Sequence, residues 1–170
     1  MTPPARPWFV GAWKRRSIMV PGGQPVEPCE AWWLQTGEVF VDVRVALPGM
    51  EHSGLPYSST RVFAGRFEIV DGEARWHVVL DSDGLVPRTD RAAAAGLYIA
   101  PDDPLLMIED APGRFREEWV QHAAGDDVES VYAPNVLTVR IGDVSGVVIS
   151  TGTAVVGRIW HPEGSIGIDA

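Results

Sequence analysis

Hydrophobic and polar residues alternate with a period of two along most of the chain, and few windows have the period of a helix. Clusters of Pro and Gly separate the alternating segments, because proline lacks a ladder donor and glycine admits turn conformations. We expect one helical turn over 91–95, ended by Gly96, and a long loop or short helix over 48–59. The pattern predicts strands over residues 8–20, 29–35, 38–47, 61–70, 73–81, 97–100, 105–109, 114–122, 129–132, 136–141, 147–150 and 154–160.

Two pairs of these strands are predicted to form hairpins. Asp71-Gly72 lies between alternating runs and is the strongest hairpin signal in the chain. Thr36-Gly37 predicts a second two-residue turn, in which Gln35 would face Glu38 and Trp33 would face Phe40.

About ten short strands with regular turn signals indicate an all-β domain, either a closed barrel or a two-sheet sandwich. We favour an antiparallel up-and-down β-barrel, because neighbouring strands then pair as a meander and closure removes exposed edges. No linker or internal repeat divides the chain, so residues 1–170 are predicted to form a single domain.

Composition and charge narrow the classes of partner. The 170 residues include 45% hydrophobic and 22% charged residues, and the formal net charge of −9 disfavours binding to a nucleic acid backbone. Cys29 is the one cysteine, which indicates a reducing compartment. The first residues lack a signal-peptide core and no stretch is long and apolar enough for a membrane helix. We therefore expect a cytoplasmic protein without nucleic acid or membrane partners, and a homodimer is compatible with the sequence.

Gly11-Ala12-Trp13 resembles the Gly-x-Trp signature of the lipocalin-like barrels of the calycin superfamily. In that family the motif lies on the first barrel strand, and an arginine on the last strand packs across the indole. The resemblance implies this role for Arg158 and implies a ligand cavity in the barrel. Three further segments also resemble a group of bacterial and fungal lipocalin-like proteins. They are Trp13-Lys14-Arg15-Arg16-Ser17-Ile18, Trp33-Leu34-Gln35 and Asp42-Val43-Arg44. A Thr-Asp-Tyr motif of the secreted lipocalins is missing, which disfavours an extracellular carrier.

The hairpin around Thr36-Gly37 has two unlike faces. One face carries valines together with Trp32 and Leu34, and the other carries Trp33, Gln35, Phe40, Asp42 and Arg44. If the mixed face lines the barrel, its rings would supply contact area and its polar groups would orient a ligand. If the valine face lines the barrel, Asp42 and Arg44 would form a solvated ion pair.

Charged residues on two other strands are further candidates. Either Arg15 or Arg16 must lie on the inner side of the first strand, where it needs a carboxylate such as Asp42 or Glu118, or an acidic ligand. A structural ion pair explains this pattern equally well. Around Trp119, Glu117 shares the face of the ring and Glu118 the opposite face, and a slip of one residue reverses the assignment.

The remaining motifs exclude several chemistries. His77 is an acid–base candidate, although the alternation places it on a polar face. The spacing of the four histidines does not favour a metal site, and the sequence contains no nucleotide-binding loop or nucleophile elbow. We expect neither a metal nor a cofactor.

Three functions remain, and the first is favoured. It is an intracellular barrel that holds a small apolar or aromatic molecule. The second is a cofactor-independent cyclase or isomerase acting in the same cavity, with Asp42, Arg44 and Glu118 as its catalytic groups. The third, a carbohydrate-binding or protein-interaction module with a flat Trp platform, is disfavoured by the lack of a signal peptide. The ligand-binding residues predicted for the first function are Trp13, Arg15, Trp33, Gln35, Phe40, Trp76, His77 and Trp119.

Overall fold

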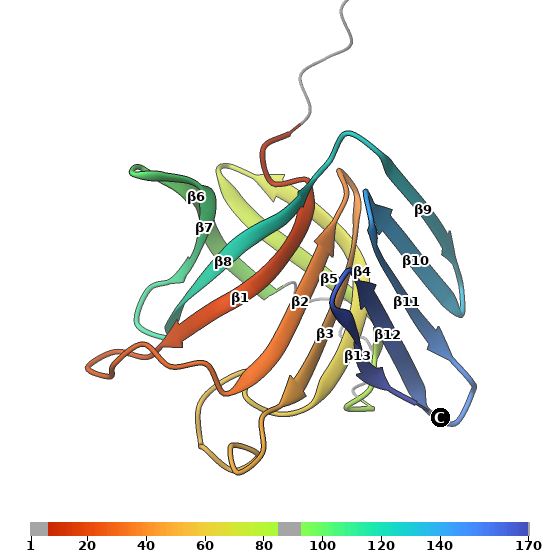
Figure 1. The fold of residues 1–170 in the computed structure, drawn as a ribbon, viewed down its shortest axis with the longest axis horizontal. Coiled ribbons are helices and arrows are strands. Elements are labelled where there is room, and N and C mark those ends of the chain that lie inside the picture. The colour runs from red at the N-terminus through yellow and green to blue at the C-terminus, as the bar shows by residue number, and fades with distance from the viewer. Residues whose placement is uncertain (1–6, 85–92, 170) are drawn as a thin grey trace, which may run out of the picture.

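The computed structural model describes residues 7–84 and 93–169, and within these residues it contains 13 β-strands and no helix (Figure 1). The all-β prediction is confirmed. The strands are β1 (Gly11–Met19), β2 (Cys29–Gln35), β3 (Val39–Ala46), β4 (Arg61–Val70), β5 (Glu73–Asp81), β6 (Ala93–Ala100), β7 (Asp103–Ala111), β8 (Phe115–Ala124), β9 (Val128–Ala133), β10 (Val136–Ile141), β11 (Val144–Ser150), β12 (Val155–His161) and β13 (Gly164–Ile168).

Strands β1 to β8 form a closed antiparallel barrel in which each strand pairs with the next. Strand β8 returns to pair with β1, where Arg15 lies opposite Trp119, so the barrel has no free edge. The predicted up-and-down barrel is thus confirmed for the first eight strands.

The last five strands form a separate sheet in the order β13-β12-β11-β10-β9, so the barrel contains eight strands rather than about ten. Figure 1 shows this sheet in blue beside β2, β3 and β4. Strands β12 and β13 contact β3 and β4, and β10 contacts β2 and β3. The pairing of β8 with β1 closes the cylinder before these strands begin, so they can only cover its outside.

Two apolar cores result, and the β2–β3 hairpin contributes to both. The core between the barrel and the five-stranded sheet contains Val41, Val43 and Val62 from the barrel and Leu137 and Val148 from the sheet. The core inside the barrel is aromatic, and its rings come from Trp13, Trp33, Phe40, Phe63, Phe67, Trp76, Phe115 and Trp119.

The two predicted hairpins form, but one has a different turn. Asp71 and Gly72 adopt positive φ angles of 53° and 80° and join Val70 to Glu73 directly, as predicted. At the other hairpin Gln35 pairs with Phe40 and Trp33 with Asp42, two positions from the predicted register. The hydroxyl of Thr36 accepts hydrogen bonds from the backbone N–H groups of Glu38 and Val39, which closes a longer turn. A shift of two residues leaves every side chain on its predicted face.

The helical turn expected over 91–95 does not form in the part of this segment that the structure describes. Residues 93–95 begin strand β6, and residues 91 and 92 lie outside the described residues. Ala94 and Ala95 pair with Arg75 and Ala74 of β5, so sheet pairing overrides the helical preference of alanine. Residues 48–59 form the loop between β3 and β4.

Arg158 does not pack across Trp13, so the role implied by the resemblance is wrong. It lies on β12 of the outer sheet, where its guanidinium donates hydrogen bonds to Ser165 and Asp169. Trp13 lies inside the barrel and donates its indole N–H to the carbonyl of Phe9 at 3.0 Å.

Candidate functional site

The mixed face of the β2–β3 hairpin lines the barrel interior. Trp33 and Phe40 belong to the inner aromatic core, and Gln35, Asp42 and Arg44 are buried with them. The valine face packs under the five-stranded sheet. Of the two arrangements that the sequence left open, the structure adopts the one that places aromatic rings beside ionisable groups, because the outer sheet buries the alternative apolar face.

Trp33 stands at the centre of the inner rings. Its ring lies 5.7 Å from that of Trp76, 5.5 Å from that of Trp119 and 6.5 Å from that of Phe67, all in edge or tilted orientations. Such contacts are favourable for aromatic pairs beyond the area they bury. The indole N–H of Trp33 donates to the side-chain oxygen of Gln35 at 2.9 Å, so Gln35 orients this ring.

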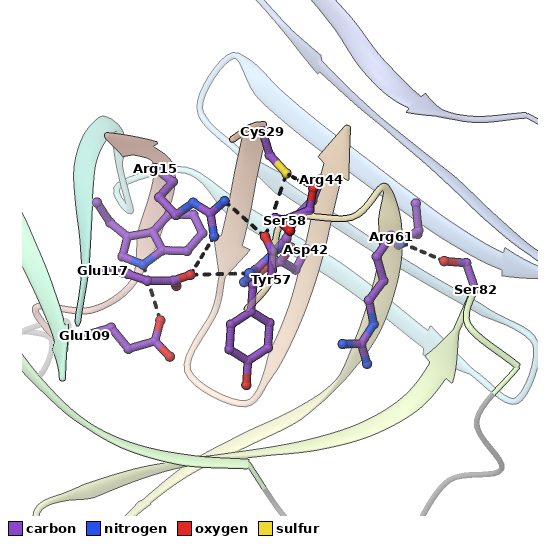
Figure 2. Close-up of polar contacts among 12 residues, drawn as sticks. Arg15, Cys29, Asp42, Arg44, Tyr57, Ser58, Arg61, Ser82, Glu109 and Glu117 are labelled. Carbon is purple, nitrogen blue, oxygen red and sulfur yellow. Dashed lines mark hydrogen bonds and ion pairs between the residues drawn. The ribbon is translucent and has the colours of Figure 1, made fainter. Parts of the chain in front are cut away.

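A chain of ion pairs runs through the same interior (Figure 2). Arg44 holds Asp42 through two hydrogen bonds of 2.8 Å and reaches Glu117 at 3.4 Å. Arg15 pairs with Glu117 as well and, toward the rim, with Glu27 at 2.8 Å. The carboxylate predicted to balance Arg15 was Asp42 or Glu118, whereas the structure supplies Glu117 and Glu27.

Burial and charge act in opposite directions on these groups. Burial on its own would raise the pKa of Glu117, but the guanidinium groups of Arg44 and Arg15 outweigh it and lower that pKa. Burial on its own would lower the pKa of Arg44, but Asp42 and Glu117 raise it well above its ordinary value. Glu117 is therefore a carboxylate and Arg44 a cation at neutral pH.

Glu109 behaves differently from its neighbour Glu117. It lies opposite Glu117 in the pairing of β7 with β8, and its carboxyl oxygen accepts a hydrogen bond from the indole N–H of Trp119 at 3.3 Å. Among the described residues, no lysine, arginine or histidine lies within ion-pair distance of it. Burial, followed by the charge of Glu117, raises the pKa of Glu109 well above its ordinary value. The surroundings of Glu109 thus favour its neutral form, whereas those of Glu117 favour the carboxylate.

A pocket of about 130 Å³ lies between these rings and charges, and we call it the inner pocket. Its walls include Trp33, Arg44, Phe63, Trp76, Glu109 and Glu117. An apolar cavity of about 150 Å³ is large enough to bind benzene. The inner pocket, at about 130 Å³, is close to that size.

A second pocket of about 240 Å³ lies at the barrel mouth and shares Arg44, Tyr57 and Arg61 with the inner pocket. Tyr57 comes from the β3–β4 loop and stands between the two spaces. Its ring packs edge-on against Phe115 at 5.0 Å, and the guanidinium of Arg44 lies 4.9 Å from the ring centre. Its backbone carbonyl accepts a hydrogen bond from Arg15 at 3.2 Å. The loop thus places one aromatic ring at the boundary between the mouth pocket and the inner pocket.

Tyr57 has a φ of 54°, a left-handed conformation that is uncommon for residues other than glycine. The thiol of Cys29 donates to the carbonyls of Tyr57 and Ser58, and these bonds help to hold the loop in this conformation. Cys29 is buried, and burial raises the pKa of its thiol.

Most of the residues predicted from the sequence meet inside the barrel, and two do not. His77 and Glu118 point outward, where His77 pairs with Glu68 and Glu118 with Arg16. Their strands alternate, so the inward positions belong to their neighbours Trp76 and Glu117. The predicted residues that the interior brings together are Trp13, Arg15, Trp33, Gln35, Phe40, Asp42, Arg44, Trp76 and Trp119.

Sequence reasoning missed Glu109 and Tyr57 and left Glu117 as one of two alternatives. Glu109 follows the apolar run Leu105–Ile108, and the break in that run is the one signal that could have identified it. Tyr57 lies in a loop without periodicity, so no pattern could have placed it at the mouth.

Comparison of the chain with protein-family models, curated proteins and solved structures finds no match. Within residues 7–84 and 93–169, no group of three or more His, Cys, Asp or Glu side chains is arranged to hold a metal ion. A helix of the length and apolarity needed to span a membrane does not occur in the described part of the chain.

Proposed function

We propose that the barrel binds a small aromatic or apolar molecule in the inner pocket. The observation that carries this proposal is an unfilled space of about 130 Å³ inside the barrel, walled by Trp33, Phe63 and Trp76. Rings give a ligand apolar contact area, and the few polar groups of the wall give it an orientation. The resemblance of Gly11-Ala12-Trp13 to the lipocalin-like signature supports the same function, since barrels of that group enclose a ligand cavity.

The charge balance of the pocket favours an uncharged ligand. Asp42 and Glu117 pair with Arg44 and Arg15, and Glu27 pairs with Arg15 toward the rim, so each of these charges already has a partner of opposite sign. An anionic ligand would lie beside buried carboxylates, and a cationic ligand beside buried guanidinium groups. Both would face repulsion in a medium of low dielectric constant.

Ligand binding can be tested with a pocket-filling variant. Val78 lines the inner pocket, and Val78→Phe would place a ring in the space that the ligand needs. We expect calorimetric titration with benzene, toluene, ethylbenzene and acetophenone to detect binding to the natural chain, and at least about tenfold weaker binding to the variant. Val131→Phe, on the exposed surface of β9, is the matched control and should bind as the natural chain does. Equal binding by the Val78 variant, or no binding of any of the four compounds, would contradict the proposal.

A cofactor-independent isomerase or cyclase in the same pocket is the second candidate. The observation that favours it is that Glu109 and Glu117 border one pocket with pKa values shifted in opposite directions, an arrangement typical of acid–base sites. In such a site Asp42 and Arg44 would remain candidate catalytic groups, as predicted. Glu117 would take the role that was predicted for Glu118. Nuclear magnetic resonance of each bound compound after incubation separates the candidates, because a binding protein returns its ligand unchanged.

A further inference from the structure

We propose that Glu109 and Glu117 form a proton-transfer pair that interconverts the keto and enol forms of a small aromatic ketone held in the inner pocket. This inference rests on the proposed binding function and names the substrate class and the reacting groups of the same site. Glu109 and Glu117 lie at directly paired positions of β7 and β8 (Figure 2). Both line the inner pocket together with Trp33 and Trp76.

The surroundings of the two groups assign the proton to Glu109. Arg15 and Arg44 both contact the Glu117 carboxylate, whereas Glu109 receives one hydrogen bond from the neutral indole of Trp119. Glu117 faces Glu109 across β8 and β7 and raises its pKa, whereas Glu109 lowers that of Glu117. In this proposal the pair shares one proton, so the two groups titrate together rather than singly.

This arrangement suits a proton shift within one substrate molecule. In the enol-to-keto direction the Glu109 O–H bond breaks, and the C=C electron pair of the enol takes its proton to form a C–H bond at the α-carbon. The enol oxygen gives its proton to Glu117, and the electron pair of that O–H bond becomes the carbonyl π bond. The proton on Glu117 then returns to Glu109, which lies at the paired position on β7. The pair is restored, and no oxidant, reductant or cofactor takes part.

Glu117 becomes a stronger base at the moment when the reaction needs one. While Glu109 is neutral, the two arginines make Glu117 a weak base. Once Glu109 has lost its proton, a second negative charge lies beside Glu117 and raises its affinity for the proton of the enol oxygen. Arg15 and Arg44 are positioning residues here, since they hold Glu117 in place.

The walls of the pocket point to an aromatic ketone. Its ring would lie among Trp33, Phe63 and Trp76, and the ketone group is uncharged and reaches hydrogen-bonding side chains without a counter-ion. An enol conjugated to a ring is planar, which fits a space bounded by flat side chains. Enolisation needs both a donor at one atom and an acceptor at another, and the pair supplies one of each.

The test uses acetophenone in deuterated buffer, with the full-length chain. The protein should accelerate the exchange of the methyl protons for deuterium, as followed by proton nuclear magnetic resonance. Glu109→Gln can neither take the α-carbon proton nor give it back, so we expect the accelerated exchange to fall by about a hundredfold or more. Saturation transfer to acetophenone in the same samples should persist in this variant. Asp110→Asn, at the next position of β7, is the matched control and should leave the exchange unchanged.

Each other result decides against part of the proposal. Binding of acetophenone without accelerated exchange would overturn the proton-transfer pair and leave the binding function standing. Binding of ethylbenzene but not of acetophenone would overturn the ketone as substrate. Failure of both compounds to bind would overturn the inference and the proposed function together. Unchanged exchange in Glu109→Gln would remove Glu109 from the reaction.

A measurement without any substrate tests the shared proton. Infrared difference spectra of the natural chain and Glu109→Gln at neutral pH should contain the C=O band of one protonated carboxyl group. The absence of that band would mean that Glu109 is ionised, and the proton-transfer pair would be wrong.

Discussion

Arg44 links the charged and the aromatic parts of the barrel interior. Its guanidinium pairs with Asp42 and Glu117, and it lies 5.3 Å from the ring centre of Phe63 and 5.6 Å from that of Trp119. A planar guanidinium can make hydrogen bonds in its plane and ring contacts above it, which a lysine could not match. Together with Tyr57, at 4.9 Å, this single side chain contacts two acids and three rings of the site.

We therefore expect Arg44→Leu to destabilise the fold strongly. The substitution leaves Asp42 buried without a counter-ion, and removing one partner of a buried pair costs about 3–5 kcal/mol. Urea unfolding followed by circular dichroism measures the loss. Arg158→Leu breaks an exposed pair with Asp169 and should cost about 1 kcal/mol or less. Similar losses in the two variants would show that the interior network contributes no more than a surface pair.

Glu109 should make the stability of the protein depend on pH. The folded state holds its proton more tightly than the unfolded state, because burial and the charges of Glu117 and Asp42 outweigh the attraction of Arg44 and raise its pKa. Its contribution is complete below the ordinary value of 4.5 and is lost as the pH rises toward the raised pKa.

Glu109→Gln removes this titration, so the variant should gain stability relative to the natural chain as the pH rises from about 4 to 8. Urea midpoints of the two proteins across this range provide the measurement. A constant difference between them at all pH values would mean that Glu109 has the same pKa in the folded and unfolded states.

The sequence predicted those residues of the site whose face of the sheet depends only on their odd or even position along the strand. Alternation placed Trp33, Asp42 and Arg44 on one face, and even a register error of two residues left that face intact. Parity could not choose between Glu117 and Glu118, because the choice depends on the direction of Trp119. The protonation of Glu109 follows from contacts between strands and has no counterpart in the local sequence.

Among the elements, the β3–β4 loop places Tyr57 on the wall that the mouth pocket and the inner pocket share. Tyr57→Ala removes the ring at this position. We expect faster association and faster dissociation of a small aromatic ligand, with a smaller change in affinity. Stopped-flow fluorescence with toluene would measure both rates. Unchanged rates would mean that ligands enter the barrel elsewhere.

The outer sheet approaches the barrel closely at Gly157 of β12. A Cβ atom at this position would lie 2.6 Å from the carbonyl oxygen of Val147 and 2.6 Å from a methyl group of Val62 in the barrel. Gly157→Ala should therefore cost about 1–3 kcal/mol through overpacking between the sheets. Gly37→Ala, where no atom lies within 4 Å, is the control and should change the urea midpoint little. Equal midpoints for the two variants would contradict the close packing.

At the scale of the whole molecule, the sequence predicted an all-β structure. It did not predict how the strands are divided between the barrel and the outer sheet. Strands β9 to β13 alternate apolar and polar residues in the same way as the barrel strands, as in Val136–Ile141. Periodicity is a local property, whereas barrel closure depends on the pairing of β1 with β8, far apart in the chain. The valines of β3 were compatible with either a lumen or an interface between sheets.

The β2–β3 hairpin is covered on both faces and paired along both edges, by β1 and by β4. Its backbone amides should thus exchange with deuterated solvent more slowly than those of β9, which forms one edge of the outer sheet and carries the exposed Val131 and Tyr132. Hydrogen–deuterium exchange mass spectrometry compares the two segments directly, and equally rapid labelling would contradict this ranking. If β3, which carries Asp42 and Arg44, unfolds locally less often than β9, this wall of the inner pocket stays in place while the edge of the outer sheet unfolds.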